Sequence, residues 1–138
     1  MYNKILHQDG FSLIELMVAI VIIGTTFLGL IQAFPYALAV IKGAENKTKA
    51  AYIAQSEIEE LYYTGYSNIA TGTIEAKHTV ASDLGIFQRQ TEVTAVDGDL
   101  NPATTDLGMK MIDVTVYYAN GVTKSEKSLQ VSTIMSNH

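Results

Sequence analysis

The feature that most constrains this chain is a long apolar stretch close to its N-terminus. Residues 11–41 carry one formal charge, that of Glu15. A helix over residues 11–34 would be about 36 Å long, because each residue adds about 1.5 Å, and the hydrocarbon core of a bilayer is about 30 Å thick. The stretch therefore predicts a membrane-spanning helix. A carboxylate inside such a helix costs free energy, so Glu15 is expected to have a partner and a purpose.

The remaining chain is long enough for one small domain. The whole sequence has 138 residues and a net charge of −5, and acidic residues outnumber basic ones after the apolar stretch. Phosphate binding depends on clustered cations, so no nucleic acid is expected as a partner. The chain has no cysteine, which excludes a disulfide framework, a thiolate metal site and a cysteine nucleophile.

Three interpretations of the N-terminal region compete. A secretory signal peptide would use a short apolar core and a small-residue cleavage site such as Ala37-Leu38-Ala39, but the apolar run before this site is too long. An ordinary single-pass anchor has a suitable length and leaves Glu15 unexplained. The third interpretation is a family resemblance, and it is carried by the residues at the start of the run.

A short motif opens the apolar run and reads Gly10-Phe11-Ser12-Leu13-Ile14-Glu15. It resembles the processing motif of bacterial type IV prepilins and type II secretion pseudopilins. The resemblance implies a leader peptide at residues 1–10, cleavage between Gly10 and Phe11 by a prepilin peptidase, and N-methylation of Phe11. A glycine before the cut would let the chain lie extended in a protease cleft, where a side chain would interfere.

The resemblance also gives Glu15 a role in assembly. Cleavage would leave a cationic amine on Phe11, and Glu15 of one subunit would pair with the Phe11 amine of a neighbour. In a low-dielectric environment this charge pair favours the correct axial register over a mispaired one. The alternative for Glu15 is a carboxylate that only reaches toward the lipid headgroups.

The orientation of the predicted span is not given by its flanking charges. Three lysines follow the span, namely Lys42, Lys47 and Lys49, so the positive-inside rule gives poor guidance. The resemblance alone implies the inner membrane, with the C-terminal domain outside the cytoplasm. Within the span, Gly24 and Gly29 permit close helix approach, and Pro35 is expected to kink or locally open the helix.

Beyond Tyr36 the pattern becomes amphipathic without an obvious break. Small and apolar residues at three- and four-residue spacing predict one buried helix face, made of Ala51, Ala54, Ile58, Leu61, Tyr62 and Gly65. Charged residues, including Glu57, Glu59 and Glu60, are assigned to the other faces. Gly65 is a plausible C-terminal stop. The predicted divisions are a leader at 1–10, a transmembrane and filament-core helix at 11–35, and a head at 36–138.

The C-terminal half alternates with a period of two, which is typical of half-buried strands. Strands are predicted at 87–96, 112–118 and 129–133, with a short edge strand at 73–80. Asn120-Gly121 is a strong chain-reversal signal. The expected fold is α+β and type IV pilin-like: a long N-terminal helix, transmembrane in its first half, whose second half packs on an antiparallel sheet of three to four strands.

One acidic segment begins like a calcium loop and reads Asp97-Gly98-Asp99-Leu100-Asn101. The pattern then fails, because Pro102 and Gly108 stand where the loop glycine and the bidentate glutamate belong. Asp106 could still join an irregular site, and a solvated acidic loop is the alternative interpretation.

Other candidate chemistry has a plainer explanation. Neither His78 nor His138 has a metal-binding spacing, and both are expected on the surface. Core and interface packing is the preferred interpretation of five tyrosines, and an aromatic binding surface is the alternative. These are Tyr62, Tyr63, Tyr66, Tyr117 and Tyr118. No catalytic residue, cofactor-binding residue or metal ligand is assigned, and no enzyme is expected.

The later part of the chain extends the resemblance. The end of the helix and the strand near Met111 resemble the minor pilin V and pseudopilin I branch. This implies a structural, minor subunit of a type IV pilus (a fimbrium) or of a type II protein-secretion pseudopilus. Its partners would be other pilin or pseudopilin subunits, the prepilin peptidase, the inner-membrane assembly machinery and the lipid bilayer. A pilus-tip binding module, either an adhesin or a DNA-uptake receptor, is the alternative.

Overall fold

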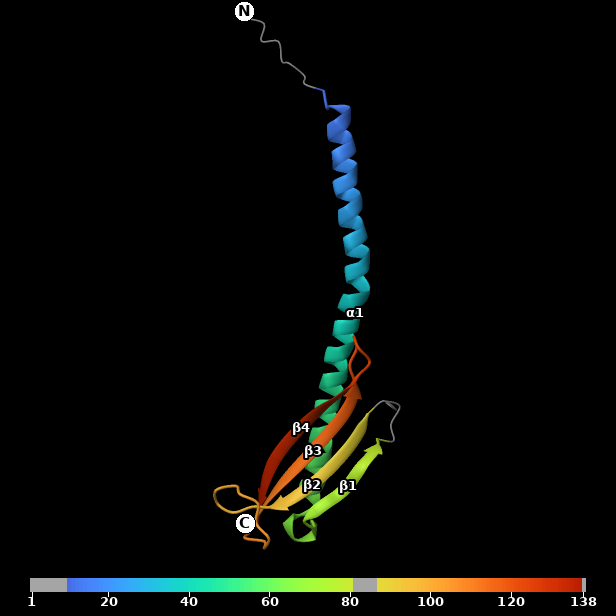
Figure 1. Ribbon diagram of the computed structural model, residues 1–138. Helices are drawn as coiled ribbons and strands as arrows, with labels where there is room; N and C mark the ends of the chain where they lie inside the picture. Colours follow the sequence, from blue (N-terminus) through green and yellow to red (C-terminus); the bar gives the residue numbers. More distant parts are fainter. Residues whose placement is uncertain (1–9, 81–86, 138) are drawn as a thin grey trace, which may run out of the picture. The chain divides into compact units, whose positions relative to one another are not determined.

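The computed structural model describes residues 10–80 and 87–137 (Figure 1). Its elements are one long helix, a short 3-10 turn and four strands: α1 (Leu13–Thr64), η1 (Tyr66–Asn68), β1 (Gly72–Thr79), β2 (Gln88–Ala95), β3 (Met109–Ala119) and β4 (Glu126–Ser136). The chain divides into two compact units, Met1–Leu38 and Ala39–His138. The predicted α+β, pilin-like fold is confirmed, because an apolar N-terminal helix continues into a part that packs on an antiparallel sheet.

Helix α1 ends where the sequence predicts. Gly65 follows its last residue and has φ +82°, a backbone conformation that favours glycine. The N–H of Gly65 donates to the carbonyl oxygens of Leu61 at 3.3 Å and Tyr62 at 3.2 Å, which satisfies two carbonyl groups at the helix end. The chain then turns through η1 into β1, so the helix and the sheet are joined by a short connection.

The four strands form an antiparallel meander in the order β1-β2-β3-β4 (Figure 1). All three main predicted strands are present, and the predicted edge strand at 73–80 is β1, which pairs with β2 through two register irregularities. The reversal at Asn120-Gly121 is confirmed in the connection from β3 to β4. There the Asn120 side-chain oxygen accepts the N–H of Val122 at 2.9 Å, closing a local turn.

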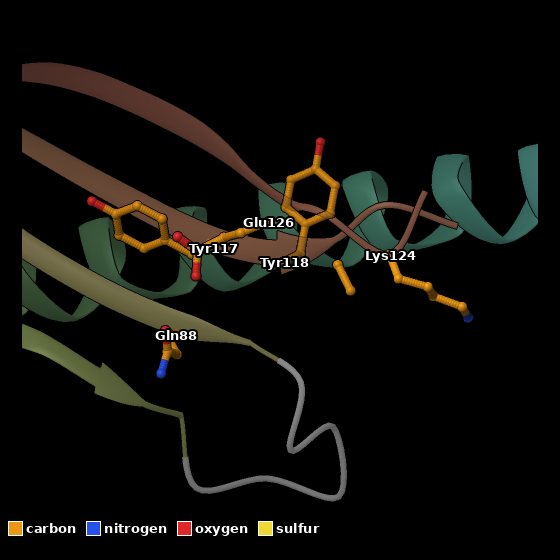
Figure 2. Close-up of a pocket in the computed structure, with 6 residues that line it drawn as sticks. Gln88, Tyr117, Tyr118, Lys124 and Glu126 are labelled. Carbon is orange, nitrogen blue, oxygen red and sulfur yellow. The ribbon is translucent and has the colours of Figure 1, made fainter. Parts of the chain in front are cut away.

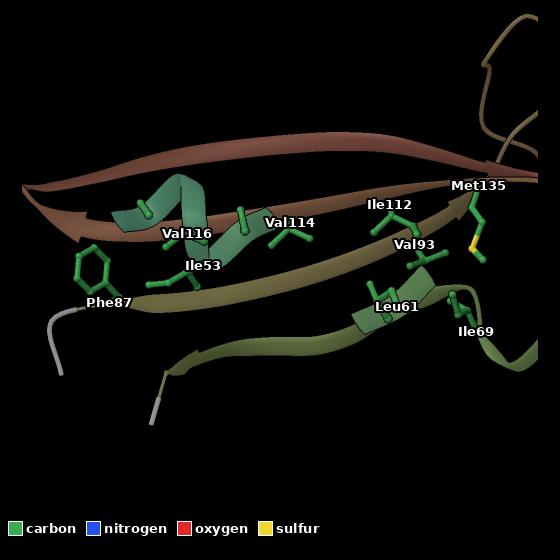
Figure 3. Packing of buried hydrophobic residues seen from close by; sticks show 11 residues of the cluster. Ile53, Leu61, Ile69, Phe87, Val93, Ile112, Val114, Val116 and Met135 are labelled. Carbon is green, nitrogen blue, oxygen red and sulfur yellow. The ribbon is translucent and has the colours of Figure 1, made fainter. Parts of the chain in front are cut away.

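The hydrophobic core lies between the sheet and the part of α1 that belongs to the second unit (Figure 3). Alternate residues of the two central strands point into it, as the predicted alternation requires. Its largest fully buried apolar side chains are Phe87, Val93, Val96, Ile112, Val114 and Val116. The helix contributes Ala50, Ile53, Ala54 and Leu61 to this cluster, and Ile58 packs against it.

The helix face that contacts the sheet is the predicted one only in part: Ala54 and Leu61 are buried and Ile58 packs against the core, as predicted. The buried residues of α1 are Asn46, Ala50, Ile53, Ala54, Glu57 and Leu61. The prediction was wrong for Ala51 and Tyr62, which are exposed, and for Glu57, which is buried instead of solvated. The physical reason is that β2 brings a cation to this face, so the buried face tolerates a carboxylate there.

Candidate functional site

The predicted cleavage segment lies at the very start of the described chain. Gly10 and Phe11 precede α1 and are exposed, Phe11 with 86% of its surface. The carbonyl of Ser12 accepts the N–H of Leu16 at 3.1 Å, so the first helical turn closes directly after Phe11. Glu15 is the acidic residue of that turn and is exposed. Its position therefore complements the positive N-terminal end of the helix dipole.

The apolar part of α1 is exposed along its whole length. The helix contains an 18-residue window with a mean hydropathy of 2.4, none of which is buried in the protein. By length and composition this is the one helix in the described chain that could cross a membrane. Large apolar side chains without protein neighbours are what a lipid-facing or subunit-facing segment presents.

Polar groups within this segment are satisfied inside the helix. The hydroxyl of Thr26 donates to the carbonyl of Ile22 at 2.8 Å, and that of Thr25 donates to Val21 at 3.0 Å. Such bonds remove the cost of an unpaired hydroxyl in an apolar environment. A Cβ added at Gly24 or Gly29 would meet no atom within 4 Å, so both glycines leave open positions on the helix surface. Helix α1 continues through Pro35.

Sequence reasoning missed a charge cluster between α1 and the sheet. Arg89 of β2 lies on the core side and bonds two carboxylates, Glu57 of α1 and Glu75 of β1. Its Nη1 is 2.6 Å from Glu57 Oε2, its Nε is 2.8 Å from Glu75 Oε2, and its Nη2 is 3.1 Å from Glu75 Oε1. His78 Nε2 joins at 3.1 Å from Glu75 Oε1. The cluster connects the helix to the two strands at one side of the sheet.

The two carboxylates share one guanidinium unequally. Burial raises the pKa of Glu57, and the attraction of Arg89 offsets this only in part, while the negative charges of Glu75 and Glu60 add to the rise. Burial alone would lower the pKa of Arg89, but the hydrogen bond to Glu75 and the negative charges of Glu57, Glu75 and Glu60 raise it. Glu75 makes the bidentate contact, which is the stronger geometry. The sequence held one signal of this cluster, because Arg89 falls on the inward-facing side of its predicted strand.

A second cation of the sheet, which is buried, fixes the connection between α1 and β1. Lys110 of β3 donates to the carbonyls of Tyr66 at 3.0 Å and Ile69 at 2.8 Å. Its ammonium lies 4.1 Å from the Tyr66 ring centroid and 3.4 Å from Asp106 Oδ2. The Tyr66 hydroxyl donates to Asp106, and partial burial together with this bond raises the pKa of Tyr66 to about 12. The arrangement serves packing and has no obvious nucleophile or base.

Two carboxylates of the acidic loop, those of Asp97 and Asp106, accept hydrogen bonds from nearby backbone N–H groups. Asp97 Oδ1 accepts the N–H groups of Asp99 and Asn101, both at 2.9 Å. The hydrogen bond from the Asn101 backbone, with smaller contributions from its side chain and from Asp99, lowers the pKa of Asp97. Asp106 accepts the N–H of Gly108 at 2.9 Å. Among the residues that the structure describes, no three His, Asp or Glu side chains gather in a way that could hold a metal ion.

The tyrosines are spread over separate positions. Tyr62 donates to the carbonyl of Ile134 at 2.8 Å, and Tyr63 is 92% exposed beside it. Tyr117 lies under Lys77, whose Nζ is 3.9 Å from the ring centroid, whereas Tyr118 packs against the core. Tyr117 and Tyr118 line a pocket of about 220 Å³ with Gln88, Ala119, Lys124 and Glu126 (Figure 2). His138 lies outside the described residues, and His78 is half-buried.

Comparison with known protein families finds one match, the prokaryotic N-terminal methylation motif, at residues 5–31. Comparisons with curated proteins and with solved structures give no match. The matched region contains Gly10, Phe11 and Glu15 and the first half of the exposed apolar helix. The N-terminal region of this chain is therefore a prepilin-type methylation motif, which supports a pilin-like protein of the inner membrane.

Proposed function

We propose that the chain is a structural, minor subunit of a type IV pilus or of a type II secretion pseudopilus. The observation that carries the proposal is the methylation motif at residues 5–31, together with the apolar part of α1, which is exposed among the residues that the structure describes. The last part of α1 and the four-stranded sheet form a head that follows this segment. The helix would anchor the subunit in the inner membrane and then form part of the filament core.

The proposed processing removes residues 1–10 between Gly10 and Phe11 and methylates the Phe11 amine. Support comes from the position of both residues ahead of α1, exposed and outside its hydrogen-bonded turns. A protease must bind an extended chain, and a segment before the first helical turn requires no unwinding. Residues 11–35 would then form the transmembrane and filament-core helix, and residues 36–138 the head.

The intact mass of the protein tests this processing directly. The full chain is expressed in membranes with and without a prepilin peptidase, extracted and weighed by mass spectrometry. We expect loss of residues 1–10 and the addition of one methyl group only when the peptidase is present. An N-terminus that stays at Met1 in both samples would overturn the proposal.

The proposed partner of Glu15 is the methylated amine of Phe11 on a neighbouring subunit. Glu15 lies in the first turn of α1, close in sequence to that amine, and the first Lys or Arg that follows it in the sequence is Lys42. An unpaired carboxylate in an apolar environment raises the free energy of the filament. An arrangement in which a neighbouring subunit places its Phe11 amine beside Glu15 is therefore favoured. The same argument explains how one register of helices is preferred over its neighbours.

Substitution of Glu15 by alanine separates assembly from insertion. Glu15→Ala is expected to insert and to be cleaved normally, but to enter filaments poorly. The matched control is Glu60→Ala, an exposed glutamate of α1 in the head. Incorporation is measured as the ratio of subunit in sheared filaments to subunit in membranes. Equal incorporation of both variants and the unmodified chain would contradict the charge-pair role.

The minor role and the likeness to the pilin V and pseudopilin I branch are tested by stoichiometry. We expect this subunit to be present at far fewer copies per filament than the most abundant pilin, and its loss to reduce the number of filaments. A copy number equal to that of the most abundant subunit would assign it as a major pilin instead.

A further inference from the structure

The lysines of the second unit are not spread evenly over its surface. Two segments distant in sequence, residues 39–49 of α1 and residues 120–127 between β3 and β4, contain Lys42, Lys47, Lys49, Lys124 and Lys127. With two glutamates in the same segments, their net charge is +3. The rest of Ala39–His138 has three basic and ten acidic residues, a net charge of −7. A chain that is acidic overall therefore has one basic end.

The fold brings these two segments together by close backbone packing. A Cβ added at Gly121 would lie 2.0 Å from the carbonyl oxygen of Ala39 and 2.5 Å from the nitrogen of Gly43, so only glycine permits the approach. The side chain of Asn46 donates to the carbonyl of Ala119 at 3.0 Å and holds the same junction. The β3–β4 connection thus lies against the first turns of α1 in this unit.

This basic end is also the part of the head nearest to the apolar segment along the chain. Ala39 directly follows Leu38, with which the first unit ends. At about 1.5 Å per helical residue, Lys42 lies only about 10 Å beyond Pro35, a distance comparable to the headgroup layer outside the hydrocarbon core. Chain connectivity alone therefore keeps the lysines close to any membrane that α1 crosses.

Two of the lysines face a common pocket. Lys47 of α1 and Lys127 of β4 line a pocket of about 320 Å³ together with Val40, Gly43, Ala44, Tyr118 and Asn120. Among the residues that the structure describes, the lysines that pair with a carboxylate are Lys42, Lys49, Lys77 and Lys110, and neither Lys47 nor Lys127 is one of them. By contrast, Lys42 and Lys49 both pair with Glu45. The amide of Asn120 uses its oxygen on Val122, which leaves its NH₂ group as a further donor.

We propose that this pocket binds the phosphate headgroup of an anionic phospholipid and seats the head on the membrane surface. The proposal rests on the membrane anchoring of α1. Two free ammonium groups and an amide donor match the oxygens of a phosphodiester, and the apolar atoms of Val40 and Ala44 suit the adjoining glycerol. The neighbouring Val122 is 42% exposed and would enter the interface, while Lys124 extends away from Tyr117 and Gln88 (Figure 2).

The test uses the full chain reconstituted into vesicles of phosphatidylcholine, with or without phosphatidylglycerol. Because the sequence has no cysteine, Val122→Cys carries a single fluorophore in the β3–β4 connection. Thr104→Cys carries one in the exposed connection between β2 and β3, at the other end of the sheet. Quenching by a nitroxide on the lipid headgroup reports contact. We expect phosphatidylglycerol to increase quenching at position 122 and not at 104, and 0.5 M salt to reverse it.

Two double variants separate the pocket from net charge. Each lysine near an anionic surface strengthens association roughly fivefold, so Lys47→Gln/Lys127→Gln should lower the ratio of docked to undocked heads roughly 25-fold. Lys42→Gln/Lys49→Gln removes the same charge from lysines that pair with Glu45 and should have a much smaller effect. An equal loss of quenching at position 122 in both double variants would overturn the proposed pocket. Quenching that is the same with and without phosphatidylglycerol would also overturn it. Flotation of the chain with vesicles in high salt is read separately, and its absence would refute anchoring instead.

Discussion

Leu16, in the first unit, has 58% of its surface exposed, whereas Glu57, in the second unit, has 7%. Both belong to the same helix. In the described part of the first unit the apolar side chains are exposed, and we propose that lipid and neighbouring subunits cover them. The second unit offers even a carboxylate a place inside, because Arg89 lies opposite. Whether a side chain is buried therefore depends on the residues that the fold places beside it as well as on its own polarity.

The strongest test of this difference between the units is the same substitution, Phe to Ala, made once in each unit. Phe87 is fully buried, so Phe87→Ala should lower the free energy of unfolding of the head by about 3–5 kcal/mol. Phe27→Ala removes the same atoms from the exposed apolar segment and should leave head unfolding unchanged. Urea unfolding in detergent micelles, followed by the near-ultraviolet signal of the tyrosines, measures both. Equal losses would mean that the units fold as one.

The next largest effect should come from the buried charges. Arg89→Met leaves Glu57 and Glu75 without their cation. The expected loss is about 2–3 kcal/mol, below the 3–5 of fully buried pairs, because the Arg89 side chain is still 17% exposed. Glu57→Leu/Arg89→Met should recover part of this stability in the same unfolding experiment. A single variant as stable as the unmodified protein would show that water reaches the cluster freely.

A smaller effect is expected at the junction of the β3–β4 connection with α1. Gly121→Ala would place a Cβ against the Ala39 carbonyl, so backbone must shift, at a cost of about 1–3 kcal/mol. Gly98→Ala is the control, since a Cβ there meets no atom within 4 Å. Thermal unfolding followed by circular dichroism compares the two. If Gly98→Ala were the more damaging, the close approach at Gly121 would not matter for stability.

The smallest effect concerns pH. Burial raises the pKa of Glu57 above its ordinary value of 4.5. A raised pKa in the folded state means that the stability linked to protonated Glu57 is present below pH 4.5 and is lost as pH rises through the folded pKa. Glu57→Gln should therefore gain stability relative to the unmodified protein across that window. Urea unfolding at pH 4 to 7, with Glu59→Gln controlling for lost charge, checks the sign. A relative loss with rising pH would mean that the attraction of Arg89 outweighs burial.

The fold was largely predictable because its signals are local. Alternation in residues 87–96 and 112–118, the reversal at Asn120 and the stop at Gly65 each depend on a few neighbouring residues. The face of α1 was not predictable in the same way. Glu57 reads as a solvated residue until Arg89, far along the chain, is placed beside it. A cation on the inward side of a predicted strand was the available signal, because a buried cation is normally paired with a carboxylate.

The candidate site also has a part that was predictable from a local motif and a part that depends on tertiary packing. Gly10, Phe11 and Glu15 come directly from a motif, since their proposed chemistry depends on residue type and order. That chemistry involves a peptidase and a neighbouring subunit, so the geometry of one chain does not determine it. The basic pocket was hidden from the sequence because Lys47 and Lys127 belong to different elements. The packing of Gly121 on α1 and the hydrogen bond from Asn46 to Ala119 bring them together.

The meander order of the sheet also has a consequence for how the head folds. Each strand pairs only with its neighbours in sequence, so every ladder closes a short loop of chain. Contacts of this kind form quickly. The long closures are those that join α1 to the sheet, such as Asn46 to Ala119 and Tyr62 to Ile134. The sheet should therefore form strand by strand, and docking of the β3–β4 connection on α1 should complete the domain.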